Sequence, residues 1–152
     1  MMYSRILVPV DGSETALRGL QEAAKVAKSC GGKVQLLHVV NEFVIDTGYA
    51  PVLYNEQLVH TLRENGKKVL ASAQAAAHEL GLEAESKLVE VIGGRAADEI
   101  VKQAVQWPAE LIVIGTHGRR GLRRLAMGSD AELVLRSSPV PVLMVRSEAE
   151  AV

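Results

Sequence analysis

The chain has 152 residues, and 17 basic against 18 acidic side chains leave a formal net charge of −1 at pH 7. A chain of this length can bury the core of one domain without disulfides, and its near-neutral charge excludes the broad basic surface of a nucleic-acid-binding protein. Aromatic residues make up 3% of the sequence, which argues against a platform for stacking single-stranded bases. With Cys30 as the only cysteine, an internal disulfide and a thiolate metal site are also excluded.

Apolar runs are short throughout the sequence. The run before Asp11 is too short for a signal peptide, and no run reaches the roughly 18 residues of a membrane-spanning helix. We therefore expect a soluble, cytoplasmic protein with no membrane partner. We expect one domain over residues 1–152, in which the polar residues 147–152 form a frayed tail.

The first predicted elements are a strand, a helix and a second strand. Residues 5–10 are short, apolar and β-branched, as in a strand, and Pro9 falls at its carboxyl end because proline has no N–H for the ladder. Residues 14–29 carry apolar side chains at steps of three and four, which predicts an amphipathic helix. Residues 33–40 predict the second strand.

The middle of the chain contains the longest irregular segment, residues 41–54, and long loops in compact domains are often functional. A long helix rich in Ala, Leu, Lys and Glu is predicted for residues 55–80. Residues 83–92 alternate polar and apolar side chains, as expected of a third strand near a sheet edge. After Gly93-Gly94, residues 95–107 predict the next helix.

Residues 109–115 predict a fourth strand, apolar enough to be buried on both faces. A short helix over 129–136 and a fifth strand over 137–146 follow. This alternation of strands and helices predicts an α/β fold: an open, doubly wound, Rossmann-like five-stranded parallel sheet with helices on both faces. The order expected is 3-2-1-4-5, counting strands along the chain.

In such a sheet, ligands bind beyond the carboxyl ends of the strands, where the strand order reverses. With the order 3-2-1-4-5, that point lies between the first and fourth strands. Residues 9–13 would then face residues 115–121, and both segments contain glycine.

A glycine motif after the fourth strand predicts an anion site. Gly115, Gly118 and Gly128 have the spacing G-x2-G-x9-G, and Ser129 follows at a predicted helix start. Glycine lets backbone N–H groups approach an anion closely, and the unpaired N–H groups of a helix start favour phosphate. The alternative is an ordinary tight connection. A Walker A loop is excluded because no lysine precedes Ser129, and a dinucleotide fingerprint would follow the first strand.

Three segments give the sequence a resemblance that runs nearly end to end: ILVPVDGSETA, LLHVV at 36–40, and the stretch 113–146 that contains the glycine motif. They resemble the universal stress protein family, and the third segment matches its nucleotide motif G-x2-G-x9-G-S. The resemblance implies the adenine nucleotide alpha hydrolase-like form of the Rossmann-like sheet. It also implies ATP as the ligand, as in the ATP-binding branch of the family.

The resemblance also implies roles for individual residues at the nucleoside end. Pro9 and Val10 would line the pocket, Asp11 would hydrogen-bond the ribose or adenine side, and Val39 would meet the adenine. Asp11 has an alternative reading, because Asp11 with Glu14 has the spacing of a helix capping box.

At the phosphate end, the resemblance implies that Gly115, His117 and Gly118 shape the loop. Gly128 and Ser129 would hold phosphates through N–H groups and the hydroxyl. We interpret His117 as lining the pocket rather than as a general base, because no orienting carboxylate is near it in sequence. His38 is interpreted as a packing residue.

Asp130 departs from the family pattern, which usually has an uncharged residue after the serine. A carboxylate in the first helical turn suits the helix dipole, but it brings negative charge close to the expected phosphates. Mg²⁺ or nearby arginines could offset that charge, or it could weaken binding.

These observations together predict an ATP-binding stress-response regulator that acts as a binding module, without catalytic residues. The family resemblance implies a homodimer formed through the last strand, residues Val140–Val145. Two alternatives remain open. One is a slow ATPase or phosphotransferase on the same fold, with Asp11 or Asp130 as the only local candidates to hold a metal, and the other is a nucleotide-free dimeric scaffold.

Overall fold

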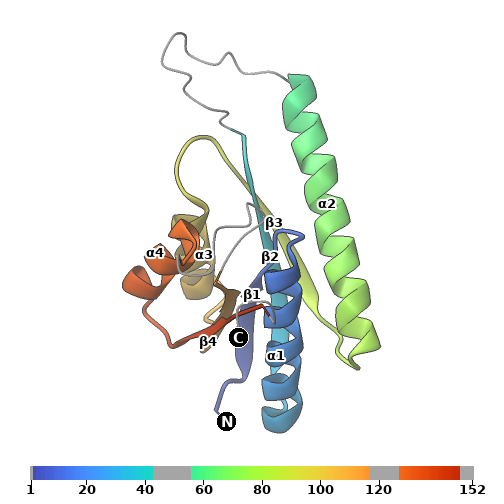
Figure 1. The fold of residues 1–152 in the computed structure, drawn as a ribbon, viewed down its shortest axis with the longest axis vertical. Coiled ribbons are helices and arrows are strands. Elements are labelled where there is room, and N and C mark those ends of the chain that lie inside the picture. Colours follow the sequence, from blue (N-terminus) through green and yellow to red (C-terminus); the bar gives the residue numbers. More distant parts are fainter. Residues whose placement is uncertain (1, 43–55, 117–126, 148–152) are drawn as a thin grey trace.

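The fold is built on a five-stranded parallel sheet with the order β3-β2-β1-β4-β5 (Figure 1). The computed structural model describes residues 2–42, 56–116 and 127–147. The strands are β1 (Arg5–Pro9), β2 (Lys33–Asn41), β3 (Glu85–Val91), β4 (Leu111–Gly115) and β5 (Val142–Val145). The predicted fold class and strand order are confirmed.

Helices cover both faces of the sheet (Figure 1). They are α1 (Glu14–Cys30), α2 (Glu56–Glu79), α3 (Ala96–Gln106) and α4 (Ser129–Ser137). Alternate residues of a strand point to opposite faces, so β1 contributes to two cores. Ile6 and Val8 pack with the apolar sides of α1 and α2, and Leu7 packs with α3 and α4.

The described helices do not include one with the length and apolar character needed to cross a bilayer.

The last strand is shorter than the sequence predicted. β5 covers Val142–Val145 instead of residues 137–146, because residues 138–140 form a local turn. The carbonyl of Pro141 accepts the Ile112 N–H at 3.0 Å at the start of the β4–β5 ladder, although proline has no N–H of its own to donate. The N–H of Val140 donates to Ser138 Oγ at 3.1 Å in a local turn. The other predicted elements agree with the structure to within two residues at each end.

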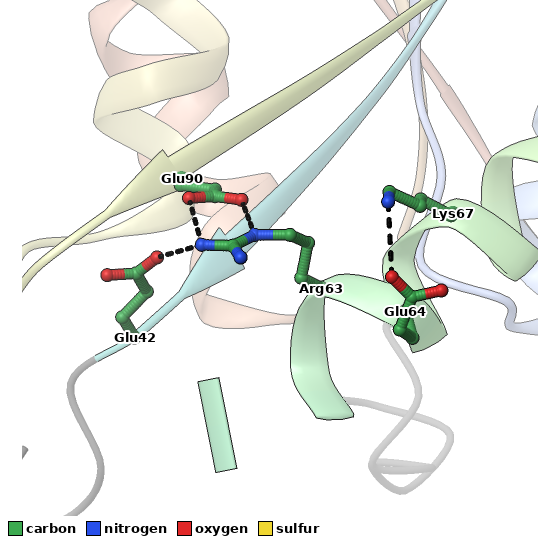
Figure 2. Close-up of polar contacts among 5 residues, drawn as sticks. All are labelled: Glu42, Arg63, Glu64, Lys67 and Glu90. Carbon is green, nitrogen blue, oxygen red and sulfur yellow. Dashed lines mark hydrogen bonds and ion pairs between the residues drawn. The ribbon is translucent and has the colours of Figure 1, made fainter. Parts of the chain in front are cut away.

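A charged cluster ties α2 to the carboxyl ends of β2 and β3 (Figure 2). The Arg63 guanidinium on α2 donates to both carboxylate oxygens of Glu90 on β3, with Nη2 3.0 Å from Oε2. Glu42, which follows β2, lies 3.8 Å from Arg63 Nη2. We call Arg63, Glu42 and Glu90 the α2 clamp.

Candidate functional site

A cavity of about 750 Å³ lies at the carboxyl ends of β1, β2 and β4. It sits where the strand order reverses, which is where the sequence placed a ligand. The starts of α3 and α4 form its walls. The predicted site residues that line it are Pro9, Val10, Asp11, Val39, Gly115, Gly128, Ser129 and Asp130.

The end of β1 brings Asp11 to the cavity. Asp11 Oδ1 accepts the Ser13 N–H at 2.9 Å, a short-range bond that shapes the turn into α1. The helix cap itself is Ser13, whose Oγ accepts the Ala16 N–H at 3.1 Å. The alternative reading of Asp11 as the cap of α1 is therefore wrong, because that role is already filled two residues later.

The end of β2 supplies Val39, His38 and Asn41 to the cavity. His38 Nδ1 lies 2.8 Å from the Val10 carbonyl. A carbonyl only accepts, so Nδ1 carries the proton, and a neutral His38 is left with Nε2 as an acceptor. This bond ties β2 to β1, as expected of a packing residue, but His38 also lines the cavity, which the sequence did not indicate.

The start of α4 presents Gly128, Ser129 and Asp130 to the cavity. The Gly128 N–H donates to the Thr116 carbonyl at 2.7 Å, and the first helical bond of α4 runs from the Glu132 N–H to the Gly128 carbonyl at 3.0 Å. Gly128 is the N-cap and offers no side-chain cap. The N–H groups of the first turn, from Ser129 on, lack helical acceptors by geometry. Those groups, rather than the Gly128 N–H, are therefore the donors that the start of α4 could offer to a ligand.

The turn between β3 and α3 supplies wall residues that sequence reasoning missed. Gly94, Arg95 and Ala96 line the cavity, and the Asn41 side-chain amide donates to the Gly94 carbonyl at 3.0 Å. Gly93 and Gly94 have positive φ angles of 67° and 105°, so the turn needs glycine at both positions. The sequence could have indicated these residues, because every strand-to-helix turn of a parallel sheet lies at its ligand-binding edge.

Charge in the cavity is unevenly distributed. Among the lining residues that the structure describes, Arg95 is the only lysine or arginine, and Asp11 and Asp130 are the acids. His117, Gly118 and the arginines between 119 and 124 lie outside the described residues. In the described ranges, no three His, Cys, Asp or Glu side chains gather as a metal site.

The strand order and the cavity at its reversal define a Rossmann-like α/β protein with a ligand site at the carboxyl edge of the sheet. The universal stress protein family model matches residues 2–146, and the chain belongs to this family.

Individual relatives resemble the chain along most of its length. The universal stress protein YxiE of Bacillus subtilis is 32% identical over an alignment of 151 residues, and the match covers 95% of this chain and 100% of the relative. The structure of UspA from Lactobacillus plantarum has a TM-score of 0.79 and 28% identity, covering 96% of this chain and 99% of its own. The structure of the universal stress protein from Archaeoglobus fulgidus in complex with dAMP has a TM-score of 0.68 and 29% identity, covering 95% of this chain and 99% of its own.

Proposed function

We propose that this protein is a cytoplasmic, adenine-nucleotide-binding stress-response regulator that binds ATP in the cavity between β1 and β4. One observation carries the proposal. Residues from three stretches far apart in sequence, represented by Asp11, Val39 and Ser129, line one cavity at the reversal of strand order. Its volume of about 750 Å³ lies within the usual range for small-molecule sites, roughly 300–1,000 Å³.

The chemistry of the walls suggests how the nucleotide lies. Val39 and Leu37 offer apolar surface for the base, and Asp11 offers a carboxylate for ribose hydroxyls. The first turn of α4 offers N–H donors and the positive end of the helix dipole for phosphate. By the family motif, His117 and Gly118 complete the phosphate loop. The similar Archaeoglobus fulgidus protein is known in complex with dAMP, which supports an adenine nucleotide here.

We propose ATP as the physiological ligand, with Mg²⁺ offsetting the negative charge that Asp130 adds to the phosphate end. The protein would act as a homodimer through Val140–Val145, and nucleotide occupancy would be its signal. The proposed role is binding rather than turnover.

The first test is the nucleotide content of the purified protein, measured by mass spectrometry after denaturation, together with its thermal shift on adding MgATP. We expect an adenine nucleotide or a clear upward shift. A nucleotide-free preparation that shows no shift contradicts the proposal.

The matched variant is Gly128→Val. Gly128 has φ −59° and ψ 146°, which any residue can adopt, and it is buried where α4 meets the cavity. The added side chain should block the ligand without straining the backbone. We expect the unliganded variant to melt cooperatively and the nucleotide-induced shift to disappear, and a shift equal to that of wild type would show that the ligand binds elsewhere.

A further inference from the structure

The turn that leads into α3 carries a cation whose place in the cavity no sequence motif indicated. We infer that Arg95 is a specificity-determining residue of the nucleotide site and that its guanidinium binds the phosphate of the ligand. This inference rests on the proposed function, since it names the group of this chain that recognises the anionic end of the nucleotide.

The position of Arg95 is fixed by its neighbours. The Asn41 amide holds the Gly94 carbonyl at 3.0 Å, which ties the turn to the end of β2. Arg95 itself is the N-cap of α3, with extended backbone angles of φ −115° and ψ 141°, and its side chain forms no capping hydrogen bond. The turn therefore presents Arg95 at the cavity wall and leaves its long side chain exposed to solvent.

The guanidinium of Arg95 differs from those of three other described arginines, which are paired with acidic side chains. Arg5, Arg63 and Arg136 each form an ion pair with a glutamate. Among the described residues, no acidic group forms an ion pair or a hydrogen bond with Arg95. A guanidinium with five donors and no acidic partner in the described part of the chain, beside a cavity of ligand size, is suited to phosphate.

The balance of charge among the described lining residues favours this role for Arg95. Asp11 and Asp130 line the same space, and both repel an anion. α3 and α4 begin on the same side of the sheet (Figure 1) and both line the cavity, so a phosphate near the start of α4 faces the wall that carries Arg95. Without Arg95, the described lining would hold two carboxylates and neither lysine nor arginine.

A guanidinium can also stack on the face of a base, and the two contacts predict different ligand dependence. If Arg95 contacts the phosphate, its removal lowers the affinity for AMP and ATP and leaves the affinity for adenosine unchanged. If Arg95 stacks on the base, its removal lowers the affinity for all three ligands alike.

The experiment is calorimetric titration of wild type, Arg95→Gln and Arg95→Lys with adenosine, AMP and ATP, at low and at physiological salt. The control is Lys102→Gln, which removes one positive charge from the exposed side of the same helix, away from the cavity. Melting of the unliganded variants confirms that each is folded.

We expect Arg95→Gln to lower the affinity for AMP by about fivefold to tenfold or more, and to lower the affinity for ATP by the same factor or a larger one. The affinity for adenosine should not change. The loss should shrink as salt rises. Arg95→Lys should recover part of the affinity, because it restores the charge without the fork of donors, and Lys102→Gln should bind like wild type.

The outcomes distinguish a failure of the role proposed for Arg95 from a failure of the proposed nucleotide binding. If wild type binds AMP and ATP and Arg95→Gln binds them equally well, the proposed role of Arg95 is overturned. The proposed nucleotide site is not affected by that result. An equal loss for adenosine and AMP also overturns it, in favour of a contact with the base. Failure of wild type to bind any of the three ligands overturns the proposed function, and the role of Arg95 with it.

Discussion

Asp130 has two opposing effects at the start of α4. It is the second residue of the helix, where a carboxylate interacts favourably with the helix dipole by about 0.3–1 kcal/mol. It also lines the cavity beside the N–H groups that we propose as phosphate donors. The residue therefore favours the helix and opposes an anionic ligand.

Asp130→Asn is expected to raise the affinity for ATP by about threefold to tenfold at low salt, because it removes one unit of repulsion from the phosphate end. Calorimetric titration at two salt concentrations measures the change, which should be smaller at the higher salt. The stability of the variant should fall by less than about 1 kcal/mol.

Asp98→Asn is the matched control. Asp98 lies in the first turn of α3 and is exposed outside the cavity lining, so its loss should cost similar helix stability and leave ATP affinity unchanged. An affinity for ATP that is the same in Asp130→Asn and wild type would show that the phosphates do not come near this carboxylate.

At the scale of elements, Gly115 explains how closely α1 approaches the end of β4. A Cβ on Gly115 would lie 2.9 Å from the Thr15 carbonyl carbon and 3.0 Å from Thr15 Cβ. Gly19 of α1 faces the same contact with more room, since its added Cβ would lie 3.7 Å from the Gly115 nitrogen. Gly115 is therefore required by helix packing, whatever it does for a ligand.

Gly115→Ala should lower the free energy of unfolding by about 1–3 kcal/mol, the usual cost of overpacking, because backbone atoms of Thr15 cannot rotate away. Gly19→Ala should be neutral or stabilising, since alanine is favoured over glycine inside a helix. Urea unfolding of both variants measures the difference, and equal stabilities would contradict this account of the contact.

The α2 clamp gives a second prediction at this scale, with a pH dependence. The hydrogen bond from Arg63 lowers the pKa of Glu90 below its ordinary value of 4.5. Burial, followed by the hydrogen bond and the negative charge of Glu90, raises the pKa of Glu42 above that value. The stabilisation from Glu90 is thus present above pH 4.5 and is lost as the pH falls through its lower folded pKa. Ionised Glu42 has the opposite effect, because it costs stability at neutral pH and that cost disappears as the pH falls through its raised folded pKa.

Glu90→Gln should therefore be less stable than wild type at pH 7, and the deficit should narrow as the pH falls below 4.5. Glu42→Gln should be at least as stable as wild type at pH 7. Urea midpoints measured at several pH values test both, with exposed Glu79→Gln as the control. A Glu90→Gln deficit that stays constant with pH would contradict the role given to its ionisation.

At the scale of the whole molecule, β5 is an edge of the sheet and is paired only with β4 among the described strands. Leu143 of β5 is 37% exposed. An apolar edge strand with open backbone groups favours pairing with another chain, which supports the proposed homodimer.

Leu143→Glu should convert a dimer into a monomer, because it places a charge at the centre of the proposed interface. Sedimentation or light scattering measures the mass over a range of concentrations. Leu135→Glu is the control, since Leu135 is 48% exposed on α4 rather than on β5. A wild-type protein that is monomeric at all concentrations, or a Leu143→Glu variant that stays dimeric, would contradict the proposal.

Much of the site could be predicted from the sequence, because local rules govern the residues concerned. Periodicity predicted the strands and helices, and the strand order that they suggested is confirmed. With that order, the rule for the carboxyl edge of the sheet placed Asp11 and Ser129 at the same site. The short β5 was missed because a local turn, in which Ser138 Oγ accepts the Val140 N–H, takes the place of the start of the predicted strand.

The sequence by itself determined the fold class and the family, since these depend on periodic patterns and on motif spacing that can be recognised without knowledge of contacts. It suggested the strand order, which the structure confirmed. Only the tertiary structure decided which groups are already engaged and which remain available. It showed that the Gly128 N–H is taken by Thr116, that Ser13 rather than Asp11 caps α1, and that Arg95 faces the cavity. Such hydrogen bonds and charge interactions can involve residues that are far apart in the sequence, so they can be identified only in the folded chain.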